Sequence, residues 1–135
     1  MPANIEAPQI SVIIPAFNEG EVIGSVVRRA RAVLDASGQT YEVLVIDDGS
    51  TDQTAAEARS AGAIVYSHPY KIGNGAAIKT GIRGALGAIL VMMDGDGQHR
   101  PEDLPKLQKE MGTYDMVVGA RTGKSKTSLQ RRLAN

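Results

Sequence analysis

The sequence contains no cysteine, which excludes a disulfide framework and a thiolate zinc site and fits a reducing compartment. Net charge is absent as well, because 15 basic residues are balanced by 15 acidic ones. A strongly basic chain would be drawn toward nucleic acid or an anionic membrane surface. We therefore expect no nucleic-acid partner, and any electrostatic attraction must be local.

Long apolar runs are missing too. The longest uncharged apolar stretch, Ala85 to Met93, has roughly half the length that a membrane helix requires. The chain opens Met-Pro-Ala-Asn-Ile-Glu, without the cationic segment and apolar run of a secretory signal. With 135 residues, of which 42% are hydrophobic, the chain is predicted to form one soluble domain over 1–135.

Five short apolar segments predict β-strands. They are Ile10 to Ile14, Tyr41 to Ile46, Ala63 to Tyr66, Ala88 to Met93 and Met116 to Val118. Their near-continuous hydrophobicity favours burial on both faces of a sheet. Because helical patterns separate the strands, we predict an α/β, Rossmann-like fold with a mostly parallel sheet flanked by helices.

Four helices are predicted between and after these strands. The first runs from Val22 to a stop at Gly38, and the second starts at Ser50. The third runs from Gly75 to Leu86, and the fourth starts at Pro101. Ser50 and Gln53 have the spacing of a capping box. The apolar faces are predicted at Ile78, Ile82 and Ala85 in the third helix and at Leu104, Leu107 and Met111 in the fourth.

Polar and acidic residues collect where the first, second and fourth strands end. The three segments are Pro15-Ala16-Phe17-Asn18-Glu19, Asp47-Asp48-Gly49-Ser50-Thr51-Asp52 and Asp94-Gly95-Asp96-Gly97-Gln98-His99. Taken singly, Asn18 and Ser50 could be helix caps and Asp47-Asp48-Gly49 a turn. The carboxyl ends of parallel strands share one edge of the sheet, where ligands bind. Acids gathered there repel one another unless a cation or a donor-rich ligand joins them.

The sharpest signal is Asp94-Gly95-Asp96. If this segment stays extended, its two carboxylates point the same way and face one point. Mg²⁺ and Mn²⁺ take such oxygen ligands and complete their shells with water and substrate phosphates. Gln98 adds a neutral oxygen, and His99 is expected to be a hydrogen-bonding neighbour rather than a ligand.

These segments, together with Gly73-Asn74-Gly75-Ala76-Ala77 and Val118-Gly119-Ala120-Arg121, resemble glycosyltransferase family 2. More narrowly, they look like its polyprenyl-phosphate (dolichol-phosphate type) mannosyl- and glucosyltransferases. The resemblance runs from about Gln9 to the last residue. It implies the nucleotide-diphospho-sugar transferase fold (GT-A) and an inverting transfer from a UDP- or GDP-sugar to an acceptor, a polyprenyl phosphate or a glycan.

The resemblance also implies the roles of individual residues. A nucleotide pocket would be formed by Pro15, Phe17, Glu19, Ile46 and Asp48, with Asp94 and Gly95 near the nucleoside and ribose. Asp96 and Gln98 would hold Mg²⁺ or Mn²⁺, and Arg121 and Arg131 would bind phosphates. Catalysis would rest on Asp96, through the metal, and on Arg121 as a cationic clamp.

Two departures from the family pattern qualify these expectations. Gly95 stands where the family often has alanine, which should loosen the loop without removing a ligand. Such transferases usually continue for about a hundred further residues that complete the acceptor site, so we expect a chain truncated at its C-terminus that binds donor but transfers sugar poorly. The basic segment 120–135 is read either as a solvated tail or as a phosphate-binding segment, and it is expected to be mobile.

The resemblance places the protein in the cytoplasm, with the full-length form expected at the cytoplasmic membrane face and a homodimer left open. Two other classes remain alternatives. A phosphorylation-receiving regulatory domain also has paired acids at a strand end, but here a full strand-helix unit precedes the pair and no lysine follows the fifth strand. A haloacid-dehalogenase-type phosphohydrolase could use Asp94 and Asp96, but it expects Thr or Val where Gln98 stands.

Overall fold

The computed structural model describes residues 6–111, 116–117 and 132–133. The chain divides into two compact units, Met1–Pro101 and Glu102–Asn135, and each is described by itself. The single domain expected over 1–135 stays a prediction. In the described part of the chain, no helix combines the length and the apolar character needed to cross a membrane.

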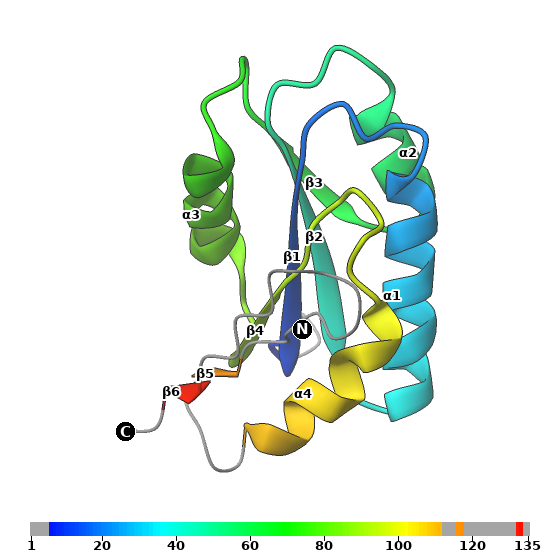
Figure 1. Ribbon diagram of the computed structural model, residues 1–135, viewed down its shortest axis with the longest axis vertical. Coiled ribbons are helices and arrows are strands. Elements are labelled where there is room, and N and C mark those ends of the chain that lie inside the picture. The colour runs from blue at the N-terminus through cyan, green and yellow to red at the C-terminus, as the bar shows by residue number, and fades with distance from the viewer. Residues whose placement is uncertain (1–5, 112–115, 118–131, 134–135) are drawn as a thin grey trace, which may run out of the picture. The chain divides into compact units, whose positions relative to one another are not determined.

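The first unit is built on a parallel four-stranded sheet (Figure 1). Its strands are β1 (Ile10–Ala16), β2 (Tyr41–Asp47), β3 (Ile64–Ser67) and β4 (Ile89–Met92), in the order β3-β2-β1-β4. Ile10 of β1 pairs with both Tyr41 and Ile89, so β1 and β2 form the centre of the sheet. The predicted α/β fold with a parallel sheet is confirmed.

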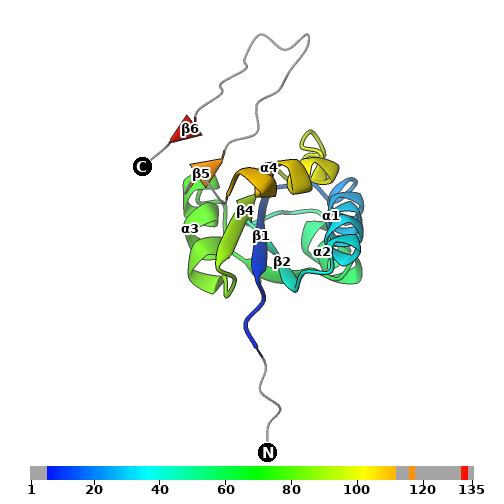
Figure 2. The same cartoon turned by 90° about the horizontal axis from the view of Figure 1, so that it is seen from below.

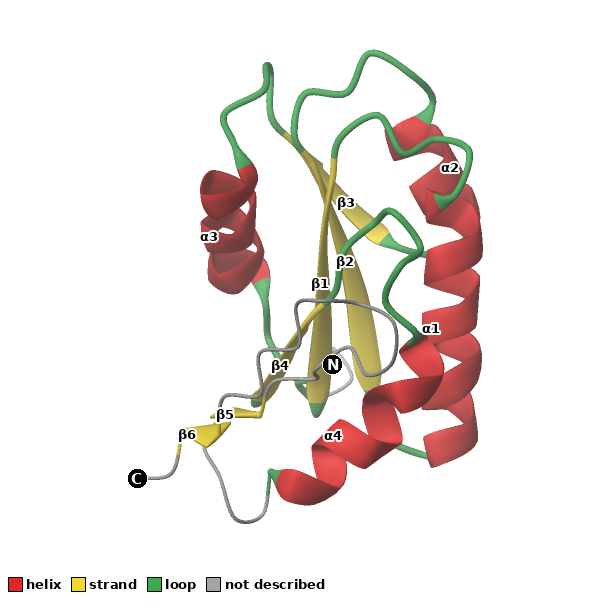
Figure 3. Cartoon of the chain, in the orientation of Figure 1, coloured by secondary structure: helices red, strands yellow, loops and turns green. Residues whose placement is uncertain are grey.

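Helices cover both faces of this sheet. They are α1 (Ile23–Ser37) and α2 (Thr54–Ser60) on one face and α3 (Asn74–Gly84) on the other (Figure 2). Helix α1 ends as predicted at Gly38, which has a left-handed conformation with φ 73° and donates its N–H to the carbonyl of Asp35. The loops that follow β1, β2 and β3, drawn in green in Figure 3, leave the sheet at the same edge.

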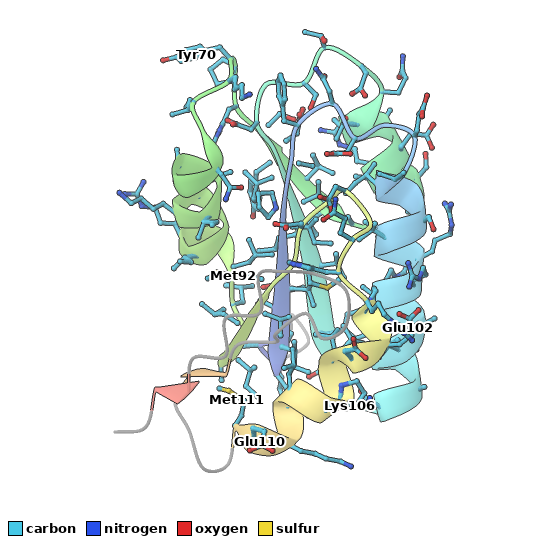
Figure 4. The ribbon with its side chains drawn as sticks, in the orientation of Figure 1. Tyr70, Met92, Glu102, Lys106, Glu110 and Met111 are labelled. Atoms are coloured by element: carbon cyan, nitrogen blue, oxygen red, sulfur yellow. The ribbon has the colours of Figure 1, made fainter. Side chains whose placement is uncertain are left out.

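Burial on both faces holds for the two central strands but is wrong for the two edge strands. β1 and β2 are almost entirely buried. In β3 and β4, by contrast, Ile64, Tyr66, Leu90 and Met92 are exposed, and Met92 (Figure 4) retains 46% of its surface. A single helix, α3, covers this face, and it packs mainly over β1 and β2, so the outer strands are covered less.

The buried face of α3 agrees only in part with the predicted one, because Ala85 packs against the core and Ile78 is half-buried. Ala77 and Gly81 are its buried residues, whereas Ile82 is 43% exposed. A Cβ at Gly81 would overlap Cγ2 of Ile13, so the missing side chain lets the helix lie directly on β1. Close backbone approach, rather than burial of the larger apolar residues, decides which face turns inward.

Helix α2 begins four residues later than predicted. The Ser50 hydroxyl does not cap it but accepts a hydrogen bond from the amide of Asn18. The N-cap residue is Gln53, whose side chain makes no capping bond, and Oδ1 of the preceding Asp52 accepts the amide of Thr54 at 2.9 Å. The predicted capping box therefore does not form.

A 3₁₀ turn at Pro101–Asp103 begins at the last residue of the first unit and runs into α4 (Leu104–Glu110) of the second, which confirms the helix start at Pro101. Of the predicted apolar face, Leu104 is buried while Leu107 and Met111 are half-buried. β5 (Met116–Val117) was predicted to join the parallel sheet, but it pairs antiparallel with β6 (Arg132–Leu133) in a separate two-stranded sheet. The rest of the basic segment 120–135 lies outside the described residues.

The close packing of α3 on β1 yields a test. Gly81→Ala should destabilise the protein by about 1–3 kcal/mol, because its new methyl group forces Ile13 out of a fully packed position. Gly75→Ala lies in the same helix with nothing near its Cβ, and it should be neutral or stabilising by up to about 1 kcal/mol. Urea unfolding of both variants measures the difference, and equal stabilities would contradict the packing described for Gly81.

Candidate functional site

The carboxyl edge of the sheet carries a cleft of about 340 Å³ within the first unit. Eleven residues line it: Pro15, Ala16, Phe17, Glu19, Asp48, Lys71, Asn74, Ala77, Asp94, Gly95 and Asp96. Seven of these were predicted from the sequence as nucleotide or metal contacts. Four segments far apart in the chain, one after each of β1, β2, β3 and β4, thus meet at the carboxyl edge of the parallel sheet, where ligands bind in such folds.

Ile46 does not line the cleft. Its side chain is 0% exposed and packs with Ile13, Leu44 and Ala77 in the core beneath α3. Ala77 does line the cleft, so the Ile46 side chain packs against a lining residue and does not itself face the cleft. The structure corrects the predicted pocket at this position.

The loops after β1 and β2 are tied together by side chains. The amide of Asn18 donates to Ser50 Oγ at 2.9 Å, and the amide of Thr51 donates to Asn18 Oδ1 at 2.9 Å. Asn18 has a positive φ of 51°, which asparagine tolerates better than most residues. These reciprocal bonds replace the helix-capping roles that Asn18 and Ser50 could have had in isolation.

The same contacts place Glu19 at the cleft. Its amide donates to Thr54 Oγ1 at 2.9 Å, and the next amide, that of Gly20, donates to Asp52 Oδ2 at 3.0 Å. Burial, with the negative charges of Asp96 and Asp52, raises the pKa of the Glu19 carboxyl above its ordinary value. The predicted mutual repulsion of acids at the strand ends is therefore present between the first and fourth strand ends.

Asp48 is the most densely bonded residue of the cleft. Its Oδ1 accepts the amide of Ile72 and the Nδ1–H of His68, at 2.9 and 2.8 Å, and its Oδ2 accepts the amide of Gly73 at 2.9 Å. Burial alone would raise the pKa of Asp48, but the bond from His68 and the two amides outweigh it and lower that pKa. The carboxylate therefore stays ionised and fastens the loop between β3 and α3 to the end of β2.

Gly49 makes this fastening sterically possible. It has a φ of 76°, and a Cβ there would overlap the backbone of Tyr70 and Lys71. Tyr70 stands at the tip of the loop (Figure 4), while its neighbour Lys71 returns to line the cleft. The loop after β3 is therefore seated on the turn that follows Asp48.

Asp94, Gly95 and Asp96 all line the cleft, but the segment forms a turn rather than the extended strand assumed in the prediction. Asp96 Oδ1 accepts the amide of Gln98 at 2.9 Å, a bond within the turn. The amide of Asp94 donates to His99 Nδ1 at 3.0 Å, so that nitrogen is an acceptor and His99 is a hydrogen-bonding neighbour, as expected.

The carboxylates at this edge could hold a divalent cation only together with a bound anion that supplies further oxygen ligands. Among the described residues, no group of three or more His, Cys, Asp or Glu side chains is arranged to hold a metal. Exposed Asp96 nevertheless lines the cleft, and its charge contributes to the raised pKa of Glu19. Mg²⁺ commonly binds through one or two carboxylates plus substrate phosphates, which matches such an incomplete protein shell.

Four lining residues were not predicted as site residues: Ala16, Lys71, Asn74 and Ala77. Asn74 and Ala77 belong to the Gly73–Ala77 motif, so that motif was a usable signal. Lys71 places its Nζ 4.1 Å from the centre of the Phe17 ring, a contact between two loops that spacing along the chain does not reveal. Arg121 and Arg131, the predicted phosphate contacts, lie outside the described residues.

A profile described as Glycosyl transferase family 2 matches residues 11–135. The uncharacterized protein MJ1222 of Methanocaldococcus jannaschii is 37% identical over 123 residues, which are 87% of this chain and 48% of that protein. The undecaprenyl-phosphate 4-deoxy-4-formamido-L-arabinose transferase of an Enterobacter species is 33% identical over 131 residues, 92% of this chain and 40% of that enzyme. The chain spans about half or less of the length of these relatives.

A solved structure shares the architecture. Glucosyl-3-phosphoglycerate synthase from Mycobacterium tuberculosis, in complex with Mn²⁺, UDP and glucosyl-3-phosphoglycerate, is 32% identical with a TM-score of 0.66. The alignment covers 77% of this chain and 39% of the synthase. The GT-A fold is thereby confirmed, and neither a phosphorylation-receiving domain nor a dehalogenase-type hydrolase is supported by these similarities.

The raised pKa of Glu19 predicts a stability change. An acid with a raised pKa in the folded protein costs stability above that pKa, and the cost disappears as pH falls below the unfolded value of about 4.3. Glu19→Gln should therefore stabilise the metal-free protein at pH 7 by a few tenths of a kcal/mol, since the group is partly solvated.

Denaturant titrations at pH 7 and pH 4 would measure this gain, which should shrink at the lower pH. Glu6→Gln removes the same charge from an exposed position outside the helices and strands and should change stability little at either pH. A Glu19→Gln variant less stable than wild type at pH 7 would contradict the repulsion inferred at the cleft.

Proposed function

The chain belongs to glycosyl transferase family 2, and we propose that its cleft binds the nucleoside diphosphate part of a UDP- or GDP-sugar. One observation carries the proposal: Glu19, Asp48 and Asp96, from three strand ends, line one cleft with Phe17 and Lys71. Hydrogen-bond acceptors for a nucleoside, an aromatic ring and a cation for phosphate are thus gathered within one site.

The nucleoside is assigned to the side of the cleft formed by β1 and β2. Phe17 offers a half-buried aromatic ring against which a planar base can pack. Glu19 and Asp48 offer carboxylate oxygens to N–H and O–H donors of the base and ribose. Asp94 and Gly95 line the same cleft and complete the proposed nucleoside contacts.

The diphosphate is assigned to the side nearer Asp96. We propose that Asp96 and Gln98 hold Mg²⁺ or Mn²⁺ there, and a similar solved structure contains Mn²⁺ and UDP. When bound, such an ion neutralises negative charge on the departing diphosphate. Lys71 lines the cleft and supplies a cation for the phosphates, while Arg121 and Arg131 remain predicted phosphate contacts.

The reaction proposed for the whole protein is an inverting displacement at the anomeric carbon of the sugar. An acceptor oxygen forms the new C–O bond while the bond to the diphosphate breaks, and its electron pair leaves with the nucleoside diphosphate. Arg121 is proposed to clamp the charge that develops on that leaving group. Asp96 is proposed to act through the metal that it holds.

For the acceptor we propose a phosphate-bearing molecule, in the first place a polyprenyl phosphate. One relative is named for undecaprenyl phosphate and a similar solved structure contains glucosyl-3-phosphoglycerate, so both names contain a phosphate. A phosphate oxygen is already largely ionised at neutral pH, which reduces the need for a general base. A lipid acceptor would bring the whole protein to the cytoplasmic face of a membrane.

Metal-linked binding tests this proposal. Wild-type protein should bind UDP or GDP at least tenfold more tightly with Mn²⁺ than with EDTA, measured by isothermal titration calorimetry. Asp96→Asn should abolish most of this difference, a loss of about 1.4 kcal/mol per tenfold, while leaving the EDTA affinity unchanged or higher, because a negative charge near the diphosphate is removed. Glu57→Gln, which removes a charge from α2 outside the cleft, should behave as wild type.

Equal wild-type affinities in Mn²⁺ and in EDTA would refute the metal site at Asp96. Failure of the wild-type protein to bind either diphosphate under any of these conditions would refute the proposed function itself.

A further inference from the structure

His68 lies directly after β3 and is held at three points. Its ring Nδ1 is 2.8 Å from Asp48 Oδ1, its ring Nε2 is 2.8 Å from Thr80 Oγ1, and its backbone amide donates to the carbonyl of Asp47 at 2.8 Å. The side chain is only 11% exposed. The ring therefore links β2, through Asp48, to α3, through Thr80, and it does not itself line the cleft.

The proton positions in this chain of bonds follow from the partners. Asp48 has a lowered pKa and is an acceptor, so Nδ1 of His68 must carry a proton. Thr80 can form a hydrogen bond with the other ring nitrogen, Nε2, whether or not that nitrogen carries a proton. Its hydroxyl donates to a neutral Nε2, or it accepts from Nε2–H while donating to the carbonyl of Ala76, 3.0 Å away. The bond from His68 to Asp48 thus persists whichever charge the ring carries.

The carboxylate of Asp48 has about four acceptor positions, two on each oxygen. Oδ1 is filled by His68 and the amide of Ile72, whereas Oδ2 accepts one bond from the described residues, that of the Gly73 amide. One position on Oδ2 is therefore left by these bonds, on a residue that lines the cleft. Because three donors fix the carboxylate from the same loop and its flanks, its orientation is set before any ligand arrives.

We propose that His68 is a positioning residue for the nucleoside: by holding Oδ1, it directs the remaining acceptor position of Asp48 toward an N–H or O–H donor of the bound nucleoside. This inference rests on the proposed function, because it assumes that the cleft binds a nucleotide. Without His68, Oδ1 of Asp48 would lose a donor, and the carboxylate could rotate. The remaining acceptor position on Oδ2 would then no longer be preorganised for the nucleoside.

Two substitutions at His68 separate its two ring contacts. In His68→Asn, the side-chain amide nitrogen is attached to Cγ, as Nδ1 is, so it can still donate to Asp48. In His68→Gln, the amide nitrogen lies one bond farther out and suits the Thr80 side instead. Both variants remain polar and neutral, so a general loss of burial or charge cannot account for a difference between them.

Affinity for UMP and GMP, measured in EDTA by calorimetry, is the readout, and thermal unfolding identifies a temperature at which all variants are folded. Whichever monophosphate wild type binds should bind His68→Asn within about threefold of wild type and His68→Gln at least tenfold more weakly. Ser67→Ala removes a neighbouring bond, from Ser67 Oγ to Asp47 Oδ2, and should leave the affinity within about twofold.

Equal affinities of the asparagine and glutamine variants, or tighter binding by the glutamine variant, would overturn the role assigned to His68 while the proposed function stands. If wild-type protein binds no nucleoside monophosphate and no diphosphate with Mn²⁺, the proposed function falls, and this inference falls with it.

Discussion

The buried carboxylate of Asp48 holds together the parts of the cleft that the chain supplies from distant positions. Its bonds to Ile72 and Gly73 seat the loop after β3, and the same loop brings Lys71 to the cleft and leads into α3. Each buried charge–amide bond is stronger than a neutral one, and an unmade bond would leave a buried charge uncompensated. The ionised Asp48 carboxylate therefore helps to fix the position of this loop.

The negative charges of the other acids in the cleft are only partly compensated. Glu19 and Asp96 stay close enough that the pKa of Glu19 is raised, although both belong to separately anchored loops. The Glu19 amide donates to Thr54 Oγ1, and the Gln98 amide donates to Asp96 Oδ1, so each loop is held in place against this repulsion. Such an arrangement stores unfavourable electrostatic energy in the free protein, and a cation bound with a diphosphate would release it. For this reason we propose that the cleft binds a metal together with an anion rather than a metal alone.

The main features that could be predicted from the sequence are those governed by local patterns. Apolar runs identified the four strands of the sheet, and their polar ends located Glu19, Asp48 and Asp96 at one edge. Prediction failed where packing between distant segments decides the outcome. The bare backbone of Gly81 against Ile13 turned α3 away from its larger apolar residues. His68 and Lys71 showed no periodicity or motif, because their partners come from other loops.

The most direct test of this account is amide hydrogen exchange at Ile72 and Gly73, followed by NMR in wild-type protein and in Asp48→Asn. If the ionised carboxylate fastens the loop, both amides are protected in wild type and exchange at least tenfold faster in the variant, while the β1 core amide of Val12 is unchanged. Undiminished protection of Ile72 and Gly73 in Asp48→Asn, with the fold intact, would contradict the claim that Asp48 assembles the cleft.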